Sequence, residues 1–413
     1  MNLSRRSLLR SAALSAALTT MPAGVKMAWG APGSDDVLIV IAMRGGWDGL
    51  HLIAPVNDAD YVAARGEALR VTANGDQRGI AVTSGPLTQN HEWRFHGRAP
   101  NMARLYHEGQ LAVVHAAGLT ADTRSHFQAI DLMETGSLDE GQLAAATGWT
   151  ARHLNLRGGT AAFTGLSTGP LMPISWRGFP GAIAIGDTGD LSLANPGLAA
   201  YLTQAHRAAA ARPATAAIGA RGVATVEAVH QYNEFPGDPI VAGDHLSVAL
   251  QTVSRVIRLN AGLRAATIDY GDWDTHVDQV GRFPNLLAHL DTKLMEFWQS
   301  LGSAQSRVTV VMMGEFGRRL EGNSNAGTDH GHGQAILVLG GGVNGGRMYG
   351  QWPGLQASAL DNGDLAITTD YRLIVGEILE KRCGNTRING FGGVFPDLQL
   401  STDPSRRWLG IVA

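Results

Sequence analysis

The chain has one cysteine among its 413 residues, and it has no long apolar run. With only Cys383 available, no disulfide can form within the chain, and we interpret this thiol as a buried, small apolar side chain. The apolar run at Ala12–Leu18 is much shorter than the roughly 20 residues that a permanent membrane helix needs. The sequence therefore predicts neither a disulfide-bonded scaffold nor an integral membrane protein.

An excess of positive charge is also missing. Four of the 33 basic residues lie within residues 1–30, which leaves 29 basic against 36 acidic residues in the remainder. Lysine and arginine do not gather in a stripe of the kind that follows a phosphate backbone. These observations argue against a nucleic acid partner.

The first thirty residues have the pattern of a twin-arginine export signal. The string Ser4-Arg5-Arg6-Ser7-Leu8-Leu9-Arg10 precedes the short apolar run, and Ala28-Trp29-Gly30 before Ala31 forms a small-x-small cleavage site. We expect a leader over 1–30 and a single domain over 31–413. We also expect a protein that crosses the membrane only during export and then resides in the periplasm or outside the cell.

Short apolar runs alternate with longer helical patterns in the remaining sequence. Continuous apolar strands are typical of a sheet that is covered on both faces, so we predict an α/β fold with a mostly parallel sheet between helix layers. Helices are expected over Phe283–Leu301 and Asp370–Cys383, and one or two more over the Ala-rich stretch Leu198–Glu227. The five predicted strands are Val37–Met43, Leu111–His115, Ala265–Tyr270, Val308–Met313 and Ala335–Leu339.

Polar residues with metal-binding side chains follow four of these strands and precede the fifth. In parallel sheets such residues gather just beyond the carboxyl ends of the strands. Aspartate and histidine together suit zinc, manganese or calcium, so we predict a site for one or two divalent ions. The clusters are Arg44–Gly49 with Asp48, Asp122–His126, Asp272–His276, Gly314–Arg319 and Thr328–Gly333 with Asp329, His330 and His332.

Several of these residues have more than one interpretation. Either Asp272 or Asp274 is suitably spaced to share an ion with His276. Asp48 is suited to holding a tight turn, Glu315 to pairing with Arg318, and His332 to a supporting hydrogen bond. His115 and His126 are expected to be packed rather than to bind metal.

Ser125 precedes a predicted helix that begins at His126. At this position a serine either caps the helix or acts as a nucleophile where the helix N-terminus favours an anion. Thr123 is the alternative for either role. Arg124 and Arg318 are candidates for binding the anion.

The motifs occur in the order Arg44–Leu50, Thr123–Phe127, Trp273–His276, Gly314–Arg318, Thr328–Gly333 and Gly340–Val343. This series resembles the secreted bacterial family called domain of unknown function 1501, over roughly Asp36 to Leu398. That family is grouped with the alkaline phosphatase and sulfatase superfamily. The resemblance implies an alkaline-phosphatase-like fold and a two-metal esterase.

Carried over by resemblance, Asp48 corresponds to the metal aspartate after the first strand, and Ser125 to the nucleophile. Asp272 or Asp274 with His276 corresponds to one metal pair, and Asp329-His330 to the other. The superfamily usually has a further metal histidine late in the chain, but no histidine follows His332 here. Three alternatives follow from this departure: His332 takes the place of the late histidine, the site holds one ion, or the site is degenerate.

The resulting expectation is an exported, metal-dependent hydrolase that acts on an anionic phosphate or sulfate ester through a serine. The sulfatase signature Cys/Ser-x-Pro-x-Arg is absent at the nucleophile, which argues against a formylglycine enzyme. The alternative is a non-catalytic binding or assembly protein that uses a degenerate phosphatase-like scaffold to hold a cell-envelope component. An oxidoreductase ranks last, because no Gly-x-Gly-x-x-Gly follows the first strand.

Overall fold

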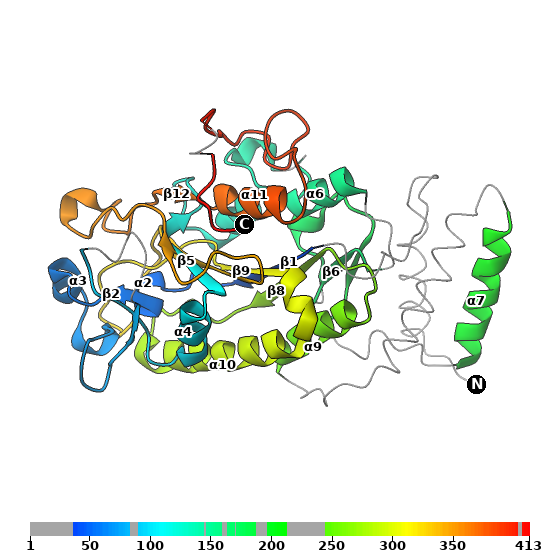
Figure 1. Ribbon diagram of the computed structural model, residues 1–413. Coiled ribbons are helices and arrows are strands. Elements are labelled where there is room, and N and C mark those ends of the chain that lie inside the picture. The colour runs from blue at the N-terminus through cyan, green and yellow to red at the C-terminus, as the bar shows by residue number, and fades with distance from the viewer. Residues whose placement is uncertain are drawn as a thin grey trace.

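The computed structural model describes residues 36–82, 90–143, 146–158, 163–169, 171–186, 196–212, 244–403 and 407–413 (Figure 1). The predicted export signal lies outside these residues. The division into a leader over 1–30 and one domain over 31–413 therefore stays a prediction. In the part of the chain that the structure describes, no helix is both long and apolar enough to cross a membrane.

A large mixed sheet forms the centre of the fold, in the order β11-β5-β10-β9-β1-β8-β6-β7, with β12 beside β5. Every pairing in it is parallel except the two made by β10, which runs opposite to β5 and β9. Its strands are β1 (Val37–Met43), β5 (Leu111–Gly118), β6 (Gly165–Ser167), β7 (Ala182–Ala184), β8 (Ala265–Tyr270), β9 (Val308–Met313), β10 (Gln334–Gly340), β11 (Met348–Tyr349) and β12 (Thr369–Asp370). The five strands predicted from apolar runs are thereby confirmed.

Helices cover both faces of this sheet (Figure 1). Alternate residues of β1 belong to two separate cores: Ile39 and Ile41 pack in one, Leu38 and Val40 in the other. The first core contains α4 (Pro100–His107), α9 (His245–Arg258) and α10 (Gln279–Ser300), and the second contains α5 (His126–Thr135), α6 (Trp149–Arg157) and α11 (Tyr371–Lys381). Because β1 is apolar on both faces, it requires both layers, which confirms the predicted class.

A small antiparallel sheet, β2-β4-β3, accompanies the large one. It consists of β2 (Ile53–Pro55), β3 (Ile80–Val82) and β4 (Trp93–Phe95), and the short helices α2 (Gly49–Leu52) and α3 (Ala59–Ala64) precede and follow β2. Short 3-10 turns lie at Glu67–Leu69, Glu140–Gln142, Ile174–Trp176, Gly302–Arg307 and Ala357–Ala359.

The predicted helices are present with shifted ends. The pattern over Phe283–Leu301 corresponds to α10, and that over Asp370–Cys383 to α11, where Asp370 caps the helix by accepting from the Arg372 N–H. Within the Ala-rich stretch, α7 (Pro196–Ala210) is helical as expected. The rest of that prediction, from residue 213 onward, lies outside the described residues.

Candidate metal centre

The polar clusters meet at one edge of the large sheet because of the strand directions. The parallel strands β1, β8 and β9 end at this edge, so the residues that follow them lie there. Since β10 runs the other way, its beginning is at the same edge, which explains why Asp329 and His330 precede a strand rather than follow one.

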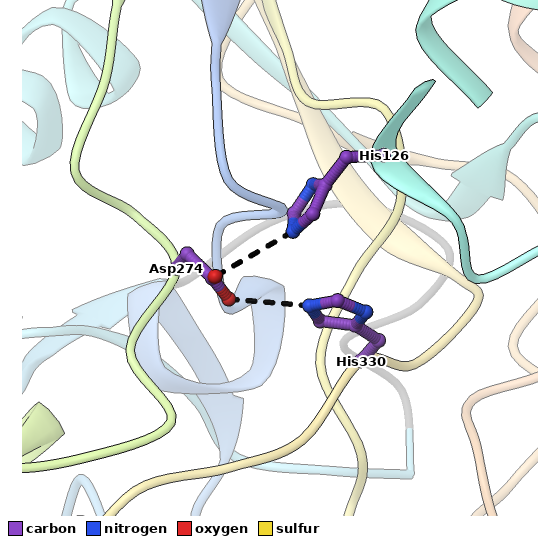
Figure 2. A group of neighbouring side chains, drawn as sticks. All are labelled: His126, Asp274 and His330. Atoms are coloured by element: carbon purple, nitrogen blue, oxygen red, sulfur yellow. Dashed lines mark hydrogen bonds and ion pairs between the residues drawn. The ribbon is translucent and has the colours of Figure 1, made fainter. Parts of the chain in front are cut away.

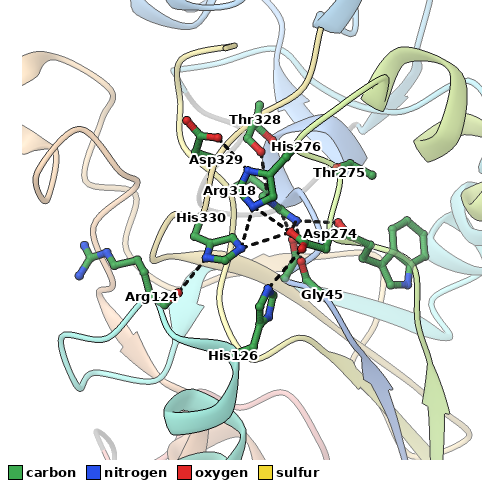
Figure 3. A network of polar contacts seen from close by, with 12 residues as sticks. Gly45, Arg124, His126, Asp274, Thr275, His276, Arg318, Thr328, Asp329 and His330 are labelled. Atoms are coloured by element: carbon green, nitrogen blue, oxygen red, sulfur yellow. Dashed lines mark hydrogen bonds and ion pairs between the residues drawn. The ribbon is translucent and has the colours of Figure 1, made fainter. Parts of the chain in front are cut away.

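Three imidazoles and one carboxylate converge at this edge (Figure 3), and Figure 2 shows His126, Asp274 and His330 by themselves. The metal-binding atoms of His126, Asp274 and His330 all lie within 4.8 Å of one another. His330 Nε2 is 3.2 Å and His276 Nε2 is 3.1 Å from Asp274 Oδ1, while His126 Nε2 is 3.6 Å from Asp274 Oδ2. The two Nε2 atoms of His276 and His330 are 2.9 Å apart. We call these four residues the histidine cluster.

The Nδ1 atom of each imidazole makes a hydrogen bond on the side of the ring away from Asp274. His126 Nδ1 lies 2.6 Å from Glu315 Oε1, His276 Nδ1 lies 2.8 Å from Asp329 Oδ1, and His330 Nδ1 lies 2.8 Å from the Arg124 carbonyl oxygen. An ionised carboxylate and a carbonyl only accept hydrogen bonds, so all three Nδ1 atoms carry the proton. In the neutral tautomer, each Nε2 therefore presents a lone pair to Asp274.

Facing lone pairs repel one another unless a cation lies between them. At 2.9 Å, the Nε2 atoms of His276 and His330 require either an added proton or a metal ion. An outer hydrogen bond from Nδ1 to a carboxylate or carbonyl is also the arrangement that orients a metal-binding histidine. The donor set of His126, His330 and Asp274, with His276 beside it, thus fits a divalent transition metal.

The charges at the cluster agree with this assignment. Burial alone would raise the pKa of Asp274, but Arg318, His276 and His330 together outweigh it and lower this pKa, which keeps the carboxylate ionised. Burial lowers the pKa of His330 and favours its neutral form. The hydrogen bond to Glu315 raises the pKa of His126, so a proton is favoured at the same Nε2 atom that a metal would occupy.

The connection between β9 and β10 positions half of the cluster. Its two arms pair as a short antiparallel bridge between Arg318 and His330. A Cβ on Gly317 would lie 1.9 Å from the Gly333 carbonyl oxygen, and one on Gly331 would lie 2.4 Å from the Arg318 carbonyl carbon. Only glycine permits this close approach of the two arms.

Arg318 links the loops at this edge of the sheet by hydrogen bonds, and its guanidinium is not directed toward a ligand. Its side chain is fully buried, and it donates to the carbonyls of Gly45, Gly46, Trp273 and Thr328 as well as to Asp274. The interpretation of Glu315 as its partner is wrong, because Glu315 bonds His126 and accepts from the Gly45 N–H at 2.9 Å.

Arg124 is directed away from the cluster (Figure 3). Its guanidinium pairs with Asp122, Asp361 and Asp364, and only its carbonyl oxygen reaches His330. Both arginines that the sequence suggested for anion binding are therefore engaged with the protein itself.

Ser125 occupies the N-cap position of α5 with extended backbone angles, φ −89° and ψ 121°. Among the described residues its side chain makes no capping hydrogen bond to the helix. Thr123 is buried, and its hydroxyl accepts from the Ser125 N–H just before the helix and donates to Gln128 within it. Ser125 lies between two residues of this site: the Arg124 carbonyl contacts His330, and His126 belongs to the cluster through its ring.

Three residues from the predicted metal set lie elsewhere. Asp48 is buried against Arg65, and its carboxylate also caps α2 through the N–H groups of Leu50 and His51. Asp272 is exposed, with a φ of 71°, and no contact of its carboxylate with the cluster is seen in the described part of the chain. His332 is buried and its nitrogens face Asp361 and the carbonyls of Leu119 and Ala121.

Two residues of the centre were not assigned to it from the sequence. His126 was interpreted as packed, and Glu315 as an ion-pair partner of Arg318. The signal that could have found them is their position, because both follow a strand that ends at the same edge as Asp274. His115, by contrast, is buried between Trp93 and Trp352, as expected for a packed histidine.

Most residues of the histidine cluster lie in a segment that matches a protein-family model. Residues 247–375 match the family model described as "Protein of unknown function (DUF1501)". The resemblance shown by the motifs is confirmed over this segment. The DUF1501 segment contains Asp274, His276, Glu315, Asp329 and His330, while His126 precedes it. No curated protein matches the chain.

Solved structures also match the chain at low identity. A protein in the alkaline phosphatase superfamily from Vibrio parahaemolyticus is 12% identical over 82% of this chain and 69% of its own, with a TM-score of 0.34. The PsFucS1 sulfatase from Pseudoalteromonas sp. is 9% identical over 84% and 68%, with a TM-score of 0.35. The alkaline phosphatase from the Antarctic bacterium TAB5 is 9% identical over 75% and 92%, with a TM-score of 0.31. With TM-scores below 0.5, these matches carry no argument about activity.

Proposed function

We propose that this protein is a metal-dependent hydrolase of phosphate or sulfate esters, with its metal held by the histidine cluster. The observation that supports this is the orientation of the three imidazoles, each with Nδ1 bonded outward and Nε2 turned toward Asp274. The side chain of Asp274 is 45% exposed, so a substrate can reach the cluster from solvent.

The donor set favours one ion of zinc or manganese. Imidazole nitrogens suit these metals better than calcium, which prefers an all-oxygen set. In the residues that the structure describes, His126, Asp274 and His330 form one potential metal-binding group, and His276 adjoins it. Since Asp48 is bonded to Arg65 and His332 to Asp361, we propose one ion rather than two.

Ser125 is the proposed nucleophile. Its hydroxyl oxygen would form a bond to phosphorus or sulfur, the bond to the leaving alkoxide would break, and the hydroxyl proton would pass to the leaving oxygen. Water would then release the phosphate or sulfate from the serine. The N-terminus of α5 favours the negative charge of the ester group, because its first N–H groups point outward. A bound divalent ion supplies further stabilisation of charge on the ester oxygens.

We also propose that the protein reaches the periplasm or the exterior through the twin-arginine pathway. Support comes from the paired Arg5 and Arg6 before the short apolar run. Because this pathway carries folded proteins, the metal would be acquired before export. Replacing both arginines with lysine should retain the protein in the cytoplasm, as fractionation would show.

Metal content is the first test of the proposed function. Purified wild-type protein should contain about one divalent ion per chain by elemental analysis, and the His330→Ala variant should contain almost none. His107→Ala is the matched control, because His107 is exposed on α4, which packs on the opposite face of the sheet from α5. Metal-free wild-type protein that stays folded and takes up no zinc or manganese would contradict the proposal.

Turnover is the second test. Metal-loaded protein is expected to hydrolyse at least one class among phosphate monoesters, phosphate diesters and sulfate esters, and Ser125→Ala should abolish this activity while the metal remains bound. If no ester in such a panel is hydrolysed, the proposal that the protein is a hydrolase is rejected, while the proposed metal centre is unaffected.

A non-catalytic cell-envelope binding protein is the second candidate. It is favoured by the engagement of Arg124 and Arg318 with the protein itself, which leaves neither arginine to bind a substrate anion. This candidate predicts saturable binding to a cell-wall polysaccharide or an envelope protein without any turnover.

A further inference from the structure

A small, open cavity lies on the α5 side of the sheet beside the histidine cluster. Residues of β1, α5, α6, β8 and β9 contribute to its wall, and apolar side chains such as Met133 and Trp149 make up much of it. Glu315, which bonds His126, belongs to the same wall. The cavity and the cluster therefore adjoin through this one side chain.

The charged groups of the cavity carry more negative than positive charge. Arg44 is its only cation among the described residues, and it pairs with both Glu134 and Asp269. Glu315 adds a third carboxylate. One guanidinium against three carboxylates leaves the lining net negative.

One carboxylate oxygen in this wall has no hydrogen-bond partner among the residues that the structure describes. Glu315 is only 3% exposed, and its Oε1 atom accepts from His126 and from the Gly45 N–H. Within the described residues, its Oε2 atom is buried without any hydrogen bond. A buried carboxylate oxygen left unbonded costs free energy, so a donor from outside the protein would stabilise it.

We propose that this cavity binds a positively charged, hydrogen-bond-donating group of the substrate, such as a primary ammonium. The inference rests on the proposed function, since the ester group of the same molecule would lie at the histidine cluster. The ammonium would donate to Glu315 and lie near Asp269, which lines the same cavity. The substrate class is then a zwitterionic aminoalkyl phosphate or sulfate.

The test compares two esters of equal size that differ only in the terminal group. O-Phosphoethanolamine ends in an ammonium, and n-propyl phosphate ends in a methyl. For metal-loaded wild-type protein we expect kcat/KM to be about tenfold higher for O-phosphoethanolamine, mainly through a lower KM, since hydrogen bonds to charged groups contribute at this level. Equal values of kcat/KM for the two esters would overturn the proposal.

Asp269→Asn tests the source of this preference. The substitution removes one carboxylate from the cavity while Arg44 keeps Glu134, so the tenfold preference should fall about threefold, as expected for a partly exposed charge. Glu296→Gln is the matched control, because Glu296 is an exposed acidic residue that pairs with Lys293 on α10. A preference that is unchanged in Asp269→Asn would contradict the role of this carboxylate.

Calorimetric titration with the same two esters separates this inference from the proposed function. Tighter binding of O-phosphoethanolamine without hydrolysis of either ester would retain the cavity assignment and reject the hydrolase. Hydrolysis of both esters without any preference would retain the hydrolase and reject the cavity assignment. Equal binding and no hydrolysis would reject both.

Discussion

The ion pair between Asp48 and Arg65 allows an effect on the stability of the fold to be distinguished from an effect on metal binding. Neither side chain is exposed, and the guanidinium donates to Oδ2 at 2.6 Å and to Oδ1 at 3.0 Å. Gln279 also donates to Oδ2 at 2.7 Å. Burial alone would raise the pKa of Asp48, but the paired Arg65 outweighs it and lowers this pKa.

Asp48→Asn removes the charge and keeps the size. Asparagine is as good an N-cap as aspartate, so α2 keeps its cap, while Arg65 remains buried without its counter-charge. Breaking a buried pair in this way costs about 3–5 kcal/mol. We therefore expect the free energy of unfolding to fall by about that amount in urea titrations followed by circular dichroism.

The same variant should keep its metal. Because the carboxylate of Asp48 is bonded to Arg65 and to the start of α2, elemental analysis should give wild-type metal content for Asp48→Asn. The double variant Asp48→Asn, Arg65→Met should regain much of the lost stability, since no unpaired charge remains. Asp272→Asn, at an exposed position, is the control and should change stability by less than about 0.5 kcal/mol. Unchanged stability together with lost metal in Asp48→Asn would refute this reasoning.

Three further predictions concern the supporting groups. Asp329→Asn should weaken metal binding about 10- to 100-fold in competition with a chelator, because it disturbs the partner of His276; an unchanged affinity would contradict this role. Ser125→Ala should retain the metal and lose turnover of any ester that the wild type hydrolyses, whereas retained turnover would direct attention to Thr123. Burial lowers the pKa of four histidines to about 3 or 4, so unfolding free energy should be maximal above about pH 6.5 and fall by up to about 1.4 kcal/mol per pH unit for each of them as the pH drops toward 4; a flat urea-denaturation profile would contradict it. These are His51 and His153, with pKa values of about 3, and His96 and His115, with values of about 4.

The strands and their shared edge were predictable because they depend on local apolar pattern. The five runs are buried on both faces except for Ala42, Asp269 and Tyr270 near the strand ends. The ligand types after Ala265–Tyr270 and before Gln334–Gly340 identified Asp274, His276 and His330 as candidates. Strand direction then brings these residues together without further information from the sequence.

The remaining assignments depended on partners that are distant in sequence. From the sequence, Asp48 looks like any aspartate at the end of a strand. Its pairing with Arg65 is not predicted by any sequence pattern. His330 and His332 are two residues apart, yet one joins the cluster while the other bonds Asp361. Asp272 has a left-handed backbone and is exposed, while Asp274 contacts His276 and His330, and an isolated sequence specifies neither arrangement.

The reversed direction of β10 has a consequence for how the centre assembles during folding. Residues 314–333 leave β9 and return beside it, so Glu315, Asp329 and His330 can be brought together by pairing of two strands that are neighbours in sequence. Such local pairing requires closure of only a short loop. His126 and Asp274 arrive with β5 and β8, whose docking closes much longer loops. Tight metal capture should therefore be a late event that reports completion of the whole sheet, and a chain that lacks either strand would hold at most a weak, partial site.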